Sequence, residues 1–409
     1  MKCRHCKSEL SVPFLNLGSA PPSNAYLTED TLKAPETWFP LRVLACGRCW
    51  LVQTEDHAGR EALFTADYAY FSSFSSSWLA HSQAYVLAMT LRFGLGSNSM
   101  VSEIAANDGY LLQYVREAGI PCYGVEPTVS TAAAAKAKGI EIVEKFFGVA
   151  LADELAAQGR RVDLVAANNV LAHVPDINDF VAGFAHLLKE QGVATFEFPH
   201  LLRMVGENQF DTAYHEHYSY LSLTAVNRIF AANGLTVFDV EEHTTHGGSL
   251  RVFAQRTDTG RRAKTDQVAA MLQREEQAFM TTAEYYGGFQ VRTNKVKDDF
   301  YAFLIEVKRQ GKSVAAYGAA AKGNTLMNYA GVRSDLISFV VDRNPAKQGK
   351  YMPGSRIPIV SESLLREKRP DYVVILPWNL KAEVMQQLDY IRDWGGQFVT
   401  AVPELRCIA

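Results

Sequence analysis

The densest group of reactive side chains in the sequence lies at positions 211–220, which read Asp-Thr-Ala-Tyr-His-Glu-His-Tyr-Ser-Tyr. A histidine titrates near neutral pH and can therefore remove a proton from a substrate as a general base. The two histidines do not match the His-Glu-x-x-His pattern of zinc proteases, so no metal is expected here. If the segment were a strand, Tyr214 and Glu216 would share one face, with His215 and His217 on the other. A polar surface loop is the alternative interpretation.

Four cysteines near the N-terminus form two Cys-x-x-Cys pairs, one at Cys3 and Cys6 and one at Cys46 and Cys49. Each pair can lie on a tight turn and offer two thiolates to one ion, and four thiolates make the closed tetrahedral site of structural zinc. Such a site leaves no position for water, so the zinc is expected to stabilise the fold and not to act in catalysis. The alternative is four unrelated cysteines.

A strand, a tight turn and the start of a helix are predicted at positions 101–112. Ala105, Asn107 and Gly109 stand at the alternate positions where small residues let a dinucleotide or S-adenosylmethionine (SAM) approach the backbone. Glu126 closes the next predicted strand, where a carboxylate can accept both ribose hydroxyls. No second acid or arginine marks NAD or NADP, and a Rossmann-like domain for another nucleotide is the alternative. The expected cofactor-binding residues are Glu103, Ala105, Asn107, Gly109, Tyr110, Glu126 and Asn168.

These residues need an α/β scaffold to position them, and the hydrophobic pattern predicts one. A helix is expected to end near Phe93, and a charged stretch at 260–310 predicts one or two connecting helices. Strands that alternate with helices indicate parallel, doubly wound sheets. The strands of the first unit are predicted at 100–105, 122–125, 162–167, 193–199, 236–241 and 249–256. Those of the second unit are predicted at 313–317, 337–341, 372–376 and 397–401.

The chain has 409 residues, a net charge of -3 and no apolar run long enough to cross a membrane. Basic residues are not in excess, so neither nucleic acid nor a membrane is expected as a partner. The N-terminus lacks the apolar stretch of a signal peptide, and paired cysteines in such a chain favour metal over disulfides. We therefore expect a cytoplasmic protein, and a monomer.

Several of these segments, in order, resemble the sugar C-3 methyltransferases of deoxysugar pathways. The shared motifs are the four cysteines, Glu-Ile-Ala-Ala-Asn-Asp-Gly from position 103, Asn-Asn-Val-Leu-Ala-His from 168, Phe-Glu-Phe-Pro-His from 196 and Tyr-His-Glu-His-Tyr-Ser-Tyr-Leu from 214. Tyr-Gly-Ala-Ala-Ala-Lys-Gly-Asn-Thr from 317 and Val-Asp-Arg-Asn-Pro from 341 extend the resemblance over essentially the whole chain. Members of this family methylate C-3 of a dTDP-4-keto-deoxysugar.

The resemblance implies an α/β protein with SAM and a structural zinc as cofactors and a nucleotide sugar as substrate. By motif, His217 matches the catalytic base of the family. Tyr214, Glu216, His173 and Tyr68 match its other active-site positions. The implied domains are a small zinc-binding domain at 1–65, a Rossmann-like SAM methyltransferase domain at 66–260, a helical connector at 261–310 and a second, C-terminal Rossmann-like α/β domain at 311–409 that helps to bind the sugar nucleotide.

The implied reaction depends on the ketone at C-4 of the sugar. The ketone acidifies the proton on C-3, and loss of that proton gives an enolate whose carbon attacks the SAM methyl group. Glu216 is expected to orient His217 or to bind a sugar hydroxyl. Tyrosine hydroxyls or His173 are expected to donate to the oxyanion at C-4.

A second glycine-flanked turn, at 318–324, follows a predicted strand and precedes a predicted helix. Such a turn can hold an anion, and Lys322 adds a positive charge for the diphosphate of the substrate. Asp342 ends the next strand and can bind a ribose, whereas a structural role is the alternative for Arg343. A purely structural turn is the alternative for the whole segment. The expected substrate-binding residues are Tyr70, Lys322, Asn324, Asp342 and Arg343.

Three other functions are compatible with parts of the sequence. A small-molecule O- or N-methyltransferase would not need the 4-keto group and would accept a reduced sugar. A zinc-ribbon nucleic-acid-modifying protein conflicts with the acidic balance and with the missing Asn-Pro-Pro-Tyr pattern of base-amino methylases. A catalytically silent binding module would leave the cluster at 214–220 without a purpose.

Overall fold

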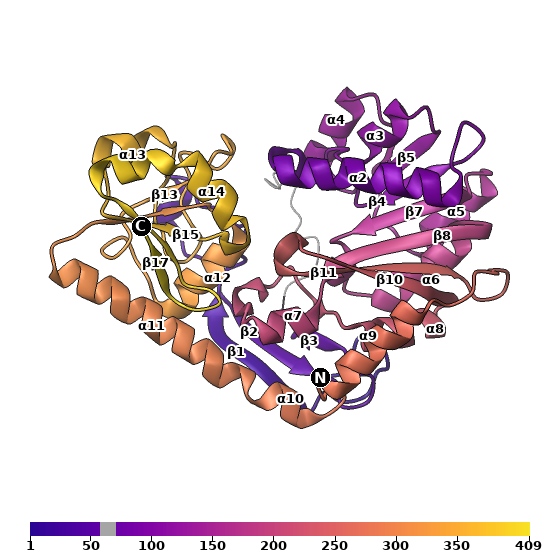
Figure 1. Cartoon of the computed structure of the whole chain (residues 1–409), viewed down its shortest axis with the longest axis horizontal. Helices are drawn as coiled ribbons and strands as arrows, with labels where there is room; N and C mark the ends of the chain where they lie inside the picture. Colours follow the sequence, from indigo (N-terminus) through magenta and orange to yellow (C-terminus); the bar gives the residue numbers. More distant parts are fainter. Residues whose placement is uncertain (58–70) are drawn as a thin grey trace.

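The computed structural model describes residues 1–57 and 71–409, and the predicted site residues Tyr68 and Tyr70 lie outside these ranges. Three β-sheets organise the described chain. Two α/β lobes are joined at their base by an N-terminal sheet and by the long helix α11 (Phe289–Arg309), as Figure 1 shows. The predicted fold class, a small zinc-binding domain with two Rossmann-like units, is confirmed.

The middle lobe contains a seven-stranded sheet in the order β10-β11-β8-β7-β4-β5-β6. Strands β4 to β8 run parallel, with helices crossing between most of them. Strand β7 (Val162–Asn168) is almost wholly buried, as its nearly continuous apolar sequence predicts for a central parallel strand. The other strands are β4 (Val101–Ile104), β5 (Cys122–Val125), β6 (Ile142–Val143), β8 (Leu188–Pro199), β10 (Leu235–His243) and β11 (Ser249–Arg256). The helices are α2 (Ser76–Phe93), α3 (Leu112–Glu117), α4 (Val129–Ala137), α5 (Val149–Ala157), α6 (Ile177–Leu187), α7 (Leu201–Gly206) and α8 (Leu223–Ala232).

This sheet is mixed, which corrects the expectation of a purely parallel arrangement. Strand β11 is antiparallel to both β10 and β8. Residues 244–248, which join β10 to β11, are too few for the crossover helix that a parallel pair requires. The tip of this hairpin lies at the edge where β8 ends, because Ser249 pairs with Pro199. Ligands of α/β sheets bind at this carboxyl edge.

Three N-terminal strands and one strand from the middle of the chain form a four-stranded antiparallel sheet in the order β1-β2-β3-β9, which was not predicted from the sequence. Its strands are β1 (Val12–Ala20), β2 (Phe39–Ala45), β3 (Val52–Thr54) and β9 (Ser219–Tyr220). The ring of Phe14 in β1 stacks on Phe289 of α11 with centroids 4.7 Å apart. The zinc-binding domain therefore shares a hydrophobic core with the connector and the C-terminal lobe.

The C-terminal lobe has a six-stranded sheet in the order β14-β13-β12-β15-β16-β17, in which the last strand is antiparallel. The connector contains three helices, whereas the sequence predicted one or two. Phe279 has a left-handed backbone just after the first helix, and this interrupts the helical run. No helix in the described ranges is long and apolar enough to span a membrane. The strands are β12 (Val314–Tyr317), β13 (Val340–Val341, shorter than predicted), β14 (Ile359–Val360), β15 (Tyr372–Ile375), β16 (Gln397–Thr400) and β17 (Arg406–Ile408). The connector helices are α9 (Asp266–Gln277), α10 (Ala283–Gly287) and α11, and the helices of the C-terminal lobe are α12 (Ala321–Ala330), α13 (Ser363–Lys368) and α14 (Lys381–Gln387).

Candidate active site

The predicted catalytic segment is a turn, so the strand that was one of the two possibilities for it does not form. The segment follows the short 3-10 helix η4 (Phe210–Thr212), and the amide of His217 donates to the carbonyl of Tyr214 at 2.9 Å. This turn brings the rings of Tyr214 and His217 together, with centroids 3.9 Å apart. His215 faces the other way, with its Nε2 3.2 Å from two carbonyl oxygens at the start of β2.

Two hydrogen bonds fix the tautomer of His217. Its Nδ1 lies 2.7 Å from the carbonyl oxygen of Thr212, which can only accept, so Nδ1 carries the proton. The lone pair is therefore on Nε2, 2.7 Å from the hydroxyl of Tyr214, which donates to it. Burial lowers the pKa of His217 well below its usual value, and the neighbouring His173 and Lys322 lower it further. The ring is thus neutral at pH 7, and its basic nitrogen faces the tyrosine hydroxyl.

His173 lies against this ring from the end of β7, in the 3-10 helix η3 (Leu171–His173). The two imidazole centroids are 4.6 Å apart in an edge-to-face arrangement. Burial lowers the pKa of His173 to about 4, and a hydrogen bond to the backbone of Glu216 opposes this effect. Both histidines are therefore neutral at physiological pH, so they lie together without charge repulsion.

Glu216 is buried, and its side chain is hydrogen-bonded to the N-terminal domain. Its Oε2 accepts a hydrogen bond from Nδ2 of Asn24 at 2.5 Å, whereas its buried Oε1 has no partner among the described residues. Burial raises the pKa of Glu216 to about 7, and Asn24 opposes this shift. A buried carboxyl with one unsatisfied oxygen is able to exchange a hydrogen bond with a bound hydroxyl group.

The loop after β4 has the backbone that its small residues predict. Ala105, Asn107 and Gly109 are all left-handed, with φ of 60°, 49° and 75°. A Cβ at position 109 would lie 2.4 Å from the side chain of Ile140, so a glycine is required there. Glu126 stabilises the loop: its Oε2 accepts from the amide of Asn107 and its Oε1 from the amide of Thr128, both at 2.9 Å.

Buried polar atoms lie beside this loop. The carboxyl oxygens of Glu103 and the Oδ1 of Asn168 are buried and make no hydrogen bond of normal length among the described residues. Burial raises the pKa of Glu103 well above its usual value, although the nearby hydroxyl of Tyr110 opposes the shift. Unsatisfied buried acceptors at the carboxyl edge of a sheet fit a ligand that brings donors. The ammonium and ribose hydroxyl groups of SAM are donors of this kind.

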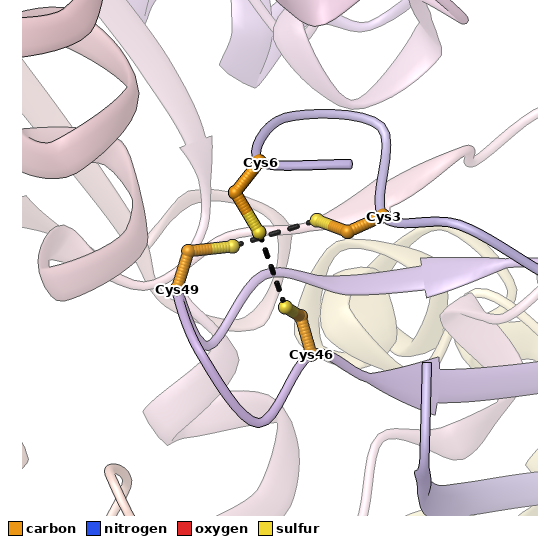
Figure 2. A group of neighbouring side chains, drawn as sticks. All are labelled: Cys3, Cys6, Cys46 and Cys49. Carbon is orange, nitrogen blue, oxygen red and sulfur yellow. Dashed lines mark hydrogen bonds between the residues drawn. The ribbon is translucent and has the colours of Figure 1, made fainter. Parts of the chain in front are cut away.

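The four predicted zinc ligands converge, as Figure 2 shows, with all Sγ atoms within 4.8 Å of one another. Zinc–sulfur bonds of about 2.3 Å would place tetrahedral sulfurs about 3.8 Å apart. The Sγ distances are 3.5 Å for Cys3–Cys49 and for Cys6–Cys46, so the donor set fits this geometry. The same turn ends each Cys-x-x-Cys pair. The residue after the pair, Lys7 in the first and Trp50 in the second, has a left-handed backbone, with φ of 60° and 64°.

Asp342 and Arg343 follow β13 at the glycine-flanked turn of the C-terminal lobe. The Oδ2 of Asp342 accepts from the amide of Ala319 at 2.8 Å and so stabilises this turn. Lys347, which the sequence analysis missed, donates to the carbonyl of Ala319 at 2.8 Å and lies 3.8 Å from Asp342. The side chain of Arg343 is exposed. The cation whose side chain donates to this turn is therefore Lys347, whereas the side chain of Lys322 contacts Asn379 and Trp378.

Lys322 and Asn324 lie at the start of α12 and contact other parts of the chain. Asn324 is buried and donates to the carbonyl of Ser23 at 2.6 Å, so it joins the C-terminal lobe to the N-terminal domain. The Nζ of Lys322 lies 3.2 Å from the Oδ1 of Asn379 and 4.6 Å from the ring centroid of Trp378.

His246 was not predicted as a site residue; it lies in the 3-10 helix η5 (Thr245–Gly247) at the tip of the β10–β11 hairpin. Its backbone is left-handed, with φ of 55°, and its ring meets Trp78 edge to face at 4.9 Å. Its buried Nδ1 has no partner among the described residues. Left-handed non-glycine residues with unsatisfied atoms are common at functional sites. The sequence signal was a histidine followed by two glycines between two predicted strands.

C-methyltransferase NovU of Streptomyces niveus is 34% identical to this chain over 408 residues, which cover 100% of this chain and 97% of NovU. The chain belongs to the C-methyltransferase family. Its methyl donor is SAM. Family models match this C-methyltransferase as a putative zinc binding domain at 3–64, a methyltransferase domain at 78–240 and a C-methyltransferase C-terminal domain at 244–403. The predicted cofactors, SAM and structural zinc, are confirmed.

Solved structures are similar to parts of this C-methyltransferase at low identity. Magnesium protoporphyrin IX methyltransferase (ChlM) from Synechocystis PCC 6803 with bound SAM is 17% identical, with a TM-score of 0.34 over 44% of this chain and 79% of that chain. The 1,6-didemethyltoxoflavin-N1-methyltransferase of Burkholderia thailandensis is 16% identical, with a TM-score of 0.36 over 51% of this chain and 96% of that chain. These similarities are too distant to assign a substrate.

Protein purified without added metal should contain about one zinc per chain by elemental analysis, because structural sites of this kind bind zinc tightly at neutral pH. Cys49→Ser should lose the zinc and lower the melting temperature. Cys407→Ser is the matched control, since Cys407 is an exposed free thiol remote in sequence from the four ligands, and should change neither. A metal-free preparation that is fully folded would contradict the assignment.

Glu126→Ala should weaken SAM binding by about 1.5–3 kcal/mol, the range for hydrogen bonds to charged groups. Calorimetric titration of the zinc-loaded protein with SAM measures this effect. Glu126→Gln should lose less affinity, because its amide oxygen can still accept one hydrogen bond. The control is Glu144→Ala, an exposed carboxylate at the end of β6. Equal SAM affinity in Glu126→Ala and Glu144→Ala would remove Glu126 from the cofactor site.

Proposed function

We propose that this C-methyltransferase acts on C-3 of a nucleotide-linked 4-keto-deoxysugar, with dTDP as the nucleotide. The observation that carries the proposal is the neutral His217, whose Nε2 lone pair faces the hydroxyl of Tyr214. Carbon is not nucleophilic until it loses a proton, so C-methylation requires a base and an acidified C–H bond. His217 is held in one tautomer beside the hydroxyl of Tyr214, which can also carry a proton, so it can serve as this base.

The proposed reaction starts with transfer of the C-3 proton to Nε2 of His217. The proton moves there directly or through Tyr214, whose oxygen then takes the carbon-bound proton while its own proton passes to Nε2. The electron pair of the C–H bond moves into the ring, and the charge appears on the oxygen at C-4. Bound SAM supplies the electrophilic methyl group. His173 and Glu216 line the same site, and Glu216 is suited to bind a sugar hydroxyl because its Oε1 has no other partner.

We further propose that the C-terminal lobe holds the nucleotide part. The turn at 318–320 is supported by the bond between Asp342 and Ala319, and Lys347 supplies a nearby cation for a diphosphate. Arg343 and Asn324 are less suited, because the first is exposed and the second already bonds Ser23. Tyr68, from the family resemblance, and Tyr70 remain site predictions from the sequence.

The enolate step can be tested apart from methyl transfer. In heavy water with S-adenosylhomocysteine in place of SAM, the enzyme should exchange the C-3 hydrogen of a dTDP-4-keto-deoxysugar for deuterium. His217→Asn should reduce this exchange by about 10²–10⁴-fold, the usual effect of losing a general base. Proton NMR measures the exchange, with an enzyme-free sample to correct for the spontaneous rate.

His215→Asn is the matched control. The turn at 214–217, here called the catalytic turn, brings Tyr214 and His217 together, whereas the side chain of His215 faces β2. The control variant should keep most of the exchange. Normal exchange in His217→Asn together with loss in Tyr214→Phe would assign the base to Tyr214. Methylation of a reduced, 4-hydroxy sugar nucleotide at the same rate as the ketone would refute C-3 methylation and indicate an O-methyltransferase.

A further inference from the structure

A buried contact joins the catalytic segment to the C-terminal lobe. The indole Nε1 of Trp378, in the 3-10 helix η6 (Trp378–Leu380), donates to Oδ2 of Asp211 at 2.8 Å. Asp211 belongs to η4, whose last residue, Thr212, provides the carbonyl that binds His217. The other carboxylate oxygen, Oδ1, is buried and has no hydrogen-bond partner among the described residues.

Lys322 reaches the same place from α12. Its Nζ lies 4.6 Å from the ring centroid of Trp378 and 3.2 Å from Oδ1 of Asn379. Residues 1–57 and 71–409 provide no carboxylate within salt-bridge distance of this ammonium. Asp211 acts on it only at longer range, partly offsetting the effect of burial, which lowers the pKa of Lys322. A desolvated cation without a direct counter-ion is costly and favours an anionic ligand.

The charge of Lys322 lies near the proposed base. It is one of the groups that lower the pKa of His217, and it lowers the pKa of His246 as well, after burial in both cases. The ammonium is therefore within electrostatic reach of two imidazoles of the site. The turn at 318–320, in contrast, has its own cation in Lys347.

We propose that Lys322, seated on Trp378 and Asn379, is a catalytic residue whose ammonium stabilises the enolate oxygen at C-4. The inference rests on the proposed function. The proton and the oxygen belong to adjacent carbons, so the base and the group that stabilises the oxyanion must lie close together. Trp378 connects the two groups: its ring carries Lys322, and its indole donates to Asp211, the neighbour of the residue whose carbonyl binds His217.

The step balances without a further reactant. The C-3–H bond breaks, its proton goes to His217, and its electron pair forms the C-3–C-4 double bond while the carbonyl π pair moves to oxygen. Lys322 keeps its proton and binds the oxygen as an ion pair. When the new carbon–carbon bond forms, the ketone returns and the S–CH₃ bond pair goes to sulfur.

Lys322→Met tests the inference, because it keeps the length of the side chain and removes its charge. With saturating dTDP-4-keto-deoxysugar, deuterium exchange at C-3 and kcat should both fall by about 10²–10³-fold, the loss seen when one oxyanion donor is removed. The affinity for the sugar nucleotide, measured by calorimetry, should change by less than about threefold. Lys322→Arg should retain more exchange than Lys322→Met, because it keeps the charge.

Lys308→Met is the matched control, because Lys308 is exposed on α11 and pairs with the exposed Asp335. It should leave both the exchange and the nucleotide affinity unchanged. Normal exchange in folded Lys322→Met would overturn the inference, and so would a loss confined to nucleotide affinity. If Lys322→Met does not fold, Asn379→Ala decides: it should lower exchange without changing affinity, and unchanged exchange would overturn the inference.

A wild-type enzyme that neither exchanges nor methylates any 4-keto sugar would refute the proposed function. That result is distinguishable from a failure of the inference on Lys322, in which the wild-type enzyme is active.

Discussion

The catalytic turn depends on hydrogen bonds that it makes to the other parts of the molecule. From the C-terminal lobe, Trp378 donates to Asp211 at 2.8 Å and the hydroxyl of Thr325 donates to the carbonyl of Ala213 at 2.9 Å. From the N-terminal domain, the side chain of Asn24 donates to Glu216 at 2.5 Å. These polar groups are largely buried, so each lost partner would leave a desolvated atom at a cost of about 1–3 kcal/mol. The geometry of His217 and its turn is therefore a property of the assembled chain.

The zinc-binding domain also contacts this turn. The second cysteine pair lies between β2 and β3, and β3 pairs with β9, the strand that directly follows the turn. Arg4, between the first two ligands, donates to the carbonyl of Tyr218 at 3.3 Å and binds Asp56. A metal with four thiolate ligands has no open position for substrate, yet it fixes the strand and the arginine that hold the end of the catalytic segment.

Local chemistry was predictable from the sequence, whereas contacts between distant segments were not. The zinc ligands follow from spacing alone, and the left-handed positions of the cofactor loop follow from Ala105, Asn107 and Gly109. The catalytic turn was mistaken for a possible strand, because tertiary hydrogen bonds and not local preference set its backbone. The sequence also placed the diphosphate cation at Lys322, next to the turn in sequence. In the fold, Lys347 reaches that turn, 28 residues away along the chain from Ala319.

The central claim is that a neutral histidine in this turn creates a carbon nucleophile. The most direct test is the position of the new methyl group. The enzyme would be given SAM labelled with ¹³C in its methyl group and a dTDP-4-keto-deoxysugar, and the product examined by carbon–proton correlation NMR. The account predicts a methyl group bonded to C-3, with long-range correlations to the C-4 ketone or its hydrate. A labelled methyl on oxygen or nitrogen, or no labelled sugar, would contradict it.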